Sequence, residues 1–115
     1  MALAGGFTAY TPEADGRISI YSDRNPRSVI SRDLLVELYV SSDFDTDGGT
    51  LSVEASVQTE PSLSTDTHWH ILEGLEDIQA NKVYRIALRA PNLSINLQNS
   101  GTPVGSIYVT YGYIS

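Results

Sequence analysis

Residues 43–54 (DFDTDGGTLSVE) match the calcium-loop pattern D-x-[DN]-x-[DN]-G-x5-E at every fixed position. Asp43, Asp45 and Asp47 alternate at its start, and Glu54 stands at the twelfth position. Calcium takes about six to eight oxygen ligands, and in such loops the final glutamate binds the ion with both of its oxygens. That glutamate belongs to a helix that leads away from the loop. The chemistry therefore depends on whether a helix follows these aspartates.

The residues after the loop have the pattern of a strand instead. Apolar and polar side chains alternate over residues 50–57, which is the period of a half-buried strand. On a strand, Glu54 lies roughly 13 Å along the chain from Thr50, too far to complete a site built by the three aspartates. We therefore predict a hairpin, with an acidic, glycine-rich connection between strands over 34–40 and 50–57, and no cofactor. The open alternative is calcium, held by the aspartates together with a neighbouring loop or subunit.

His68 and His70 flank the only tryptophan, Trp69, and their spacing on a strand could hold a transition metal. The chain has no cysteine and no third histidine, so carboxylates would have to supply the other ligands. We expect instead that Trp69 and Ile71 fill the core while both histidines stand outside. The sequence contains neither a G-x-S-x-G nucleophile elbow nor a phosphate-binding glycine motif. We therefore expect no catalytic residues and no enzymatic activity.

The composition limits the classes of partner. A chain of 115 residues suits one domain, since it buries roughly two-thirds of its extended surface. The formal net charge of −7 disfavours nucleic acid, which needs a basic face. No stretch approaches the ~20 apolar residues of a membrane helix. The start of the chain lacks the basic and apolar regions of a signal peptide, so we expect the protein to be made in the cytoplasm of its producer.

Short alternating segments, separated by turn residues, recur along the chain. About seven such strands without a long helix are typical of an antiparallel sandwich or small barrel. We predict an all-β fold, a single antiparallel β-sandwich of jelly-roll or immunoglobulin-like type. Residues 1–16 show no sustained period and are expected to form an extended N-terminal arm, with the sandwich domain over 17–115. The candidate strands cover residues 17–21, 34–40, 50–57, 67–72, 82–89, 93–98 and 105–114.

Some large apolar side chains fall on the wrong face of their strand for a simple core. Leu35 and Tyr39 lie opposite the main apolar face of 34–40, and Tyr108 lies opposite that of 105–114. Apolar groups on both faces indicate an outer surface that a partner covers. We take these three residues, together with Tyr10 of the arm, as interface candidates and expect a homo-oligomer.

Five short segments carry a resemblance to a known class of proteins. They are LSVEAS (51–56), WHIL (69–72), VYRI (83–86), APNL (90–93) and GSIYVT (105–110). In these motifs the chain resembles small β-sandwich virion proteins of tailed bacteriophages, over about residues 34–114. The resemblance implies a structural role without catalysis, as a capsid decoration (cement) protein or as a tail or fibre component.

The same resemblance implies partners and a location. The protein would form a homo-oligomer, with a trimer favoured, and would bind the phage major capsid protein. It would be made in the bacterial host cytoplasm and then sit on the capsid surface of the virion. The strand-and-tryptophan arrangement is also similar to carbohydrate-binding sandwiches, so a sugar-binding module remains the alternative.

Overall fold

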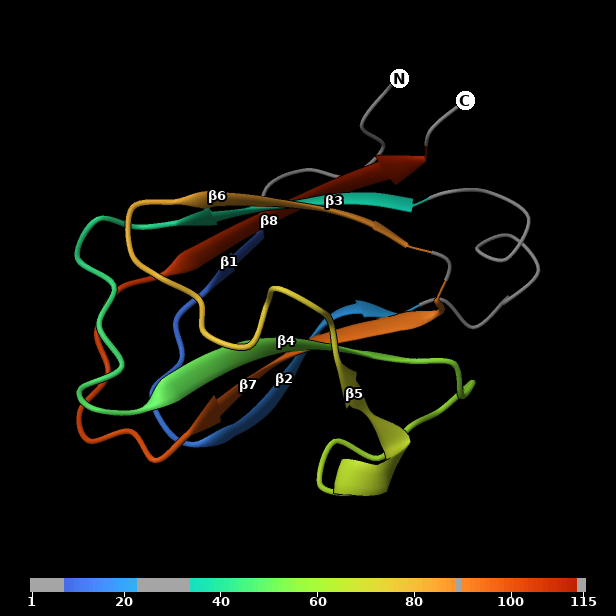
Figure 1. The fold of residues 1–115 in the computed structure, drawn as a ribbon, viewed down its shortest axis with the longest axis horizontal. Coiled ribbons are helices and arrows are strands. Elements are labelled where there is room, and N and C mark those ends of the chain that lie inside the picture. The colour runs from blue at the N-terminus through green and yellow to red at the C-terminus, as the bar shows by residue number, and fades with distance from the viewer. Residues whose placement is uncertain (1–7, 23–33, 89, 114–115) are drawn as a thin grey trace.

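The computed structural model describes residues 8–22, 34–88 and 90–113. These residues form an antiparallel β-sandwich, which confirms the predicted all-β fold (Figure 1). Sheet A has the strand order β1-β8-β3-β6, and sheet B has the order β2-β7-β4-β5. The strands are β1 (Thr8–Tyr10), β2 (Gly16–Ser22), β3 (Leu34–Val40), β4 (Thr50–Ser56), β5 (His70–Ile71), β6 (Val83–Leu88), β7 (Asn92–Gln98) and β8 (Ile107–Tyr113). One short 3-10 helix, η1 (Asp66–His68), lies between β4 and β5.

The strand order identifies a jelly roll rather than an immunoglobulin-like sandwich. Strand β1 pairs with β8, β2 with β7, β3 with β6 and β4 with β5, all antiparallel. The chain is therefore one long hairpin that has been rolled up, and the rolling adds the β3–β8 and β4–β7 pairs. Strand β1 is additional to the seven predicted strands. It comes from the region predicted as an arm, where Thr8–Tyr10 forms the edge of sheet A.

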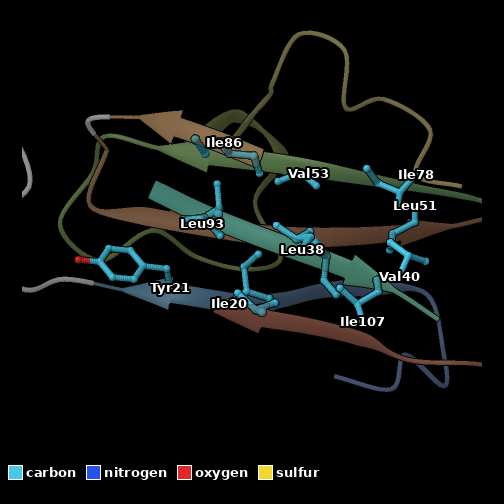
Figure 2. Packing of buried hydrophobic residues seen from close by; sticks show 14 of the residues in the cluster. Ile20, Tyr21, Leu38, Val40, Leu51, Val53, Ile78, Ile86, Leu93 and Ile107 are labelled. Atoms are coloured by element: carbon cyan, nitrogen blue, oxygen red, sulfur yellow. The ribbon is translucent and has the colours of Figure 1, made fainter. Parts of the chain in front are cut away.

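The core lies between the two sheets, as the alternation of apolar side chains requires (Figure 2). Eleven inward-facing residues of the four central strands are each at most 6% exposed. Full burial of a large apolar side chain contributes about 1.5–3 kcal/mol. The inward-facing residues of the four central strands are Val36, Leu38, Val40, Leu51, Val53, Ala55, Leu93, Ile95, Leu97, Ile107 and Val109.

Strand β2 departs from strict alternation. Its register with β7 shifts between Ser19 and Tyr21, so the consecutive residues Ile20 and Tyr21 are both buried. The ring of Tyr21 meets Tyr111 of sheet A edge-on, with centroids 5.2 Å apart. This aromatic pair joins the two sheets.

The predicted hairpin between residues 34–40 and 50–57 is wrong. Strand β3 belongs to sheet A and β4 to sheet B, so residues 41–49 cross from one layer of the sandwich to the other. An alternating pattern shows which side of a strand is buried, but not which strand it pairs with. Two neighbours in one sheet and two strands that face each other across a core show the same alternation. The nine-residue spacing between the two strands argues against a hairpin, because hairpin loops usually have about two to five residues.

Candidate functional site

The calcium-like loop uses its aspartates to bind its own backbone and a neighbouring loop. Asp45 pairs with Val104 through two backbone hydrogen bonds of 3.0 Å. The Asp45 carboxylate accepts a bond from the Asp47 N–H at 2.8 Å, and the Asp47 carboxylate accepts one from the Thr102 N–H at 2.7 Å. Asp43 accepts a bond from the Ser41 hydroxyl at 2.6 Å. The three carboxylates therefore stabilise the crossing between the sheets.

Glu54, the twelfth residue of the calcium pattern, lies on β4, as its alternating neighbours predict. Its carboxylate binds Arg17 of β2, on the outer face of sheet B. In the ranges that the structure describes, no three side chains of His, Asp or Glu gather in a way that could hold a metal ion. The residues that match the calcium pattern therefore have two separate structural roles. The aspartates bind the crossing loop and its neighbour, and Glu54 forms an ion pair on sheet B.

The tryptophan segment is only partly as predicted. Trp69 is buried, but Ile71 is 50% exposed, which makes the prediction of Ile71 in the core wrong. The strand expected over 67–72 is reduced to the two residues of β5, preceded by η1. Ile71 stands opposite Glu54 and therefore shares the outer face of sheet B. His70 is exposed, whereas His68 is partly buried and accepts a bond from the Ser62 N–H at 2.9 Å.

Three of the four interface candidates lie on one surface, the outer face of sheet A. In the sheet register, Tyr39 stands between Tyr108 of β8 and Val83 of β6. Leu35 lies four residues before Tyr39 on β3, between Gly112 and Ala87. Tyr108 is 39% exposed and Val83 49% exposed. We call this surface the tyrosine face, made up of Ala9, Leu35, Glu37, Tyr39, Val83, Arg85, Ala87, Tyr108, Thr110 and Gly112.

One ion pair lies in the middle of the tyrosine face. Arg85 donates to Glu37 at 2.7 Å across the β3–β6 pair. The Glu37 side chain is 10% exposed, but the Arg85 side chain is 72% exposed and remains largely in solvent. The face is thus an apolar surface with one neutralised pair of charges, on a chain whose net charge is −7.

The fourth interface candidate, Tyr10, is on the other side of sheet A. It stands opposite Ile107 in the register and packs against the core. Burial, with a smaller effect from Tyr111, raises the pKa of the Tyr10 hydroxyl. Tyr10 therefore does not belong to the tyrosine face, because its side chain packs against the core on the inner side of sheet A.

The outer face of sheet B has the opposite character, because most of its side chains on β4 and β7 are polar and yet buried. Residues 57–69, which we call the cover segment, run beneath this sheet from the end of β4 to β5 (Figure 1). The Leu63 carbonyl accepts a bond from Arg17 at 3.0 Å, and the Ser62 carbonyl accepts one from the Trp69 indole N–H at 2.9 Å. The buried polar residues of this face are Ser52, Glu54, Ser56, Asn92, Ser94 and Asn96, each at most 7% exposed.

Arg17 connects sheet B to the cover segment. Its guanidinium binds Glu54 at 2.6 Å and Asp66 of η1 at 2.7 Å. Burial acts to lower the pKa of Arg17, but the hydrogen bonds to the two carboxylates outweigh it and raise the pKa. The side chains of Arg17 and Glu54 are only 6% and 5% exposed, so this is a buried ion pair.

The cover segment and the outer face of sheet B form two adjoining cavities. The first, of about 310 Å³, is lined by Ser19, Ser22 and Asn92 of the sheet and by Glu60 and Trp69 of the cover segment, among others. The second, of about 500 Å³, includes Asp15, Arg17, Asp66 and Asn96 in its lining. Leu63 lines both cavities. Sequence reasoning missed this site, because alternation alone assigns such polar positions to solvent.

Compared with protein-family models, with curated proteins and with solved structures, the chain shows no significant match. Among the described residues, no helix has the length and apolar character needed to cross a bilayer.

Proposed function

We propose that the protein is a non-enzymatic structural protein of a tailed-phage virion, and that it acts as a capsid decoration (cement) protein. It is made in the bacterial cytoplasm and binds the major capsid protein on the surface of the head. It bridges neighbouring shell subunits by contact alone.

The observation that carries this proposal is the tyrosine face. The outward positions of an uncovered antiparallel sheet are normally polar. Here Tyr39, Tyr108 and Val83 form a continuous row across three strands, with Leu35 and Ala87 in a parallel row. The polar row of Thr110, Glu37 and Arg85 separates these two rows. Exposed apolar side chains gathered on one face in this way indicate an interaction site. Tyrosine suits such a site because it offers a large apolar body and a polar tip.

The fold is compatible with this role. Jelly rolls occur in viral capsid proteins and also in lectin domains, so the architecture supports a contact protein without choosing between the two. The positions of the histidines also favour a structural role, since His68 accepts a hydrogen bond from Ser62 within the cover segment and His70 faces solvent. The resemblance of the strand motifs to phage virion proteins is the reason for proposing a capsid protein and not a lectin.

Binding to phage heads tests the proposal directly. Heads of the phage that encodes this chain, assembled without it, are mixed with the purified protein, sedimented and imaged by cryo-EM. We expect density on the head surface. Val83→Lys and Tyr108→Lys should weaken binding by about tenfold or more, because each places a charge in the apolar contact.

Val57→Lys is the matched control. Val57 is 74% exposed and apolar but lies outside the tyrosine face, so its replacement should leave binding unchanged. Equal binding by wild type and Val83→Lys would exclude this face as the contact. Density on the tail in place of the head would support the alternative, a tail- or fibre-associated protein.

The homo-oligomer belongs to the same proposal, with a trimer favoured. Light scattering after size-exclusion chromatography measures the mass directly. We expect about three times the mass of one chain, since decoration proteins of this class commonly act as closed oligomers. A monomer at all concentrations would remove the oligomer from the proposal.

A further inference from the structure

The floor of the two cavities on sheet B consists of small groups that form hydrogen bonds. Ser19 and Ser22 of β2 and Asn92 of β7 line the first cavity, and Asn96 of β7 lines the second. Sheet faces beneath a covering segment are usually apolar, because burying polar groups costs free energy unless they are bonded. Here Asn92 accepts a bond from the Ser22 hydroxyl at 3.0 Å and donates one to the Gln58 carbonyl, while Ser19 and Ser22 are exposed. The floor therefore presents polar groups to whatever fills the cavity.

The wall of the first cavity adds apolar surface to these polar groups. Thr59 and Glu60 of the cover segment contribute a hydroxyl and a carboxylate, while Pro61, Leu63 and Trp69 contribute apolar surface. Ligand sites combine such apolar walls with a few convergent polar groups, and typically have volumes of about 300–1,000 Å³. A pyranose ring has matching chemistry, since hydroxyl groups line its edge and C–H groups cover its faces.

The charges around the cavities disfavour other classes of ligand. Glu60 lines the first cavity, and Asp15 and Asp66 line the second, so an anion would be repelled. Arg17 is already bound to Glu54 and Asp66. Trp69 is only 8% exposed, which leaves no open ring face for stacking a nucleobase. A neutral, polyhydroxylated ligand fits best.

Ser94 provides an independent observation at the same place. It lies between Asn92 and Asn96 on β7, opposite Ser19 in the register with β2. Its side chain is fully buried, and its hydroxyl has no hydrogen-bond partner among the described protein groups. Leaving such a group unsatisfied costs about 1–3 kcal/mol. Ser94 itself lines neither cavity, but its unpaired hydroxyl lies on the stretch of β7 between Asn92 of the first cavity and Asn96 of the second.

We propose that the groove formed by these two cavities binds a neutral oligosaccharide, with one sugar unit in the first cavity and the next beyond Leu63 in the second. The site is on the opposite sheet from the tyrosine face. Sugar binding and virion attachment can therefore succeed or fail separately.

Titration with defined sugars, followed by two-dimensional NMR of the 15N-labelled protein, tests this proposal. The probes are glucose, galactose and N-acetylglucosamine, and the tetrasaccharides maltotetraose, cellotetraose and chitotetraose. We expect at least one series to shift the Trp69 indole N–H signal and the amide signals of Ser19 and Asn92. Its tetrasaccharide should bind about tenfold or more tighter than its monosaccharide, because it reaches both cavities.

Ser19→Leu fills the first cavity without removing any hydrogen bond assigned to that side chain. It should reduce affinity by about tenfold or more, while thermal unfolding shows that the protein still folds. Glu60→Gln should alter affinity for the same sugar, and Glu73→Gln, an exposed carboxylate outside the groove, should not. Three results would each overturn the proposal: no shifts with any probe, shifts that lie outside the groove, or preferential binding of a sulfated tetrasaccharide over the neutral ones.

Discussion

The two outer faces of this sandwich invert the usual relation between polarity and exposure. The tyrosine face of sheet A carries exposed apolar side chains, such as Val83 at 49%, around the buried Glu37 and Thr110. The outer face of sheet B is polar and covered, with Ser56 and Ser94 fully buried. The comparison teaches that the pattern of a strand alone does not determine what its outer face meets. A segment between two strands can bury a polar face, while apolar side chains on the other outer face stay exposed.

The two faces also differ in how their ion pairs are placed. The Arg17–Glu54 pair is buried and anchors the cover segment through Asp66, whereas Arg85 of the Glu37–Arg85 pair is mostly in solvent. Removing one partner of a buried pair leaves an uncompensated charge, but an exposed pair contributes little. The same substitution on the two faces should therefore have very different effects.

The largest effect is expected for Arg17→Met. This change leaves the buried Glu54 carboxylate without its partner and releases Leu63 and Asp66 of the cover segment. We expect a loss of about 3–5 kcal/mol in the free energy of unfolding, measured by urea denaturation. The double variant Arg17→Met/Glu54→Leu should recover much of this loss, because it removes the unpaired charge. A loss below about 1 kcal/mol for the single variant would mean that the pair is not buried in solution.

A smaller effect is expected for Trp69→Phe. The phenylalanine ring fills part of the site, but it cannot donate to the Ser62 carbonyl. We expect a loss of about 1–2 kcal/mol and faster proteolytic cleavage within residues 57–69, because one anchor of the cover segment is gone. His70→Asn, at the exposed neighbouring position, should leave both measurements unchanged. Unchanged cleavage in Trp69→Phe would show that other contacts hold the segment.

On the tyrosine face, Arg85→Met should cost little. Since 72% of the Arg85 side chain is exposed, its bond to Glu37 is screened by water. We expect a change of about 0–1 kcal/mol in the free energy of unfolding, measured under the same conditions as Arg17→Met. A loss as large as that of Arg17→Met would contradict the contrast between the two faces.

The smallest effect concerns pH at the open end of the second cavity. Hydrogen bonds from the Ser100 hydroxyl and backbone N–H, with a weaker one from the Asn99 N–H, lower the pKa of Asp15 below its ordinary value of 3.8. The contribution of Asp15 to stability is therefore present above pH 3.8, and it is lost as pH falls through the lowered value. Asp15→Asn should show a shallower fall of melting temperature between about pH 4 and 2. Parallel curves for the two proteins would exclude this linkage.

The sequence predicts the inward faces of the sandwich well. Alternation along residues 34–40 and 50–57 identifies the buried side of β3 and β4, and it also separates Leu35, Tyr39 and Tyr108 from the core. Alternation does not predict which strands pair, because pairing in a jelly roll joins segments that are far apart in the chain. The position of Tyr10 against the core follows from its pairing with Ile107, which the sequence does not indicate.

The candidate site on sheet B was harder to predict, but one signal was present. The outward positions of β4 and β7 carry small groups, such as Ser52, Ser94 and Asn96, where solvated strands commonly carry long charged side chains. Small polar residues leave room for a segment to lie close above them. Residues 57–69 gave no sign of this role, because a polar segment with Pro61 has the composition of an ordinary loop.

The rolled-hairpin topology has a consequence for how the chain reaches its native state. The outermost pair, β1 with β8, joins the first and last described strands, and only the two-residue β5 pairs with the strand just before it. Nearly every ladder must therefore close a long loop before it gains contacts, which makes folding slow, on the order of milliseconds to seconds. Any single cut between β2 and β7 divides the strands of both sheets, so neither fragment holds a complete sheet. Assembly should be a single late, cooperative event, during which the bare edges of unpaired strands are the main risk of aggregation.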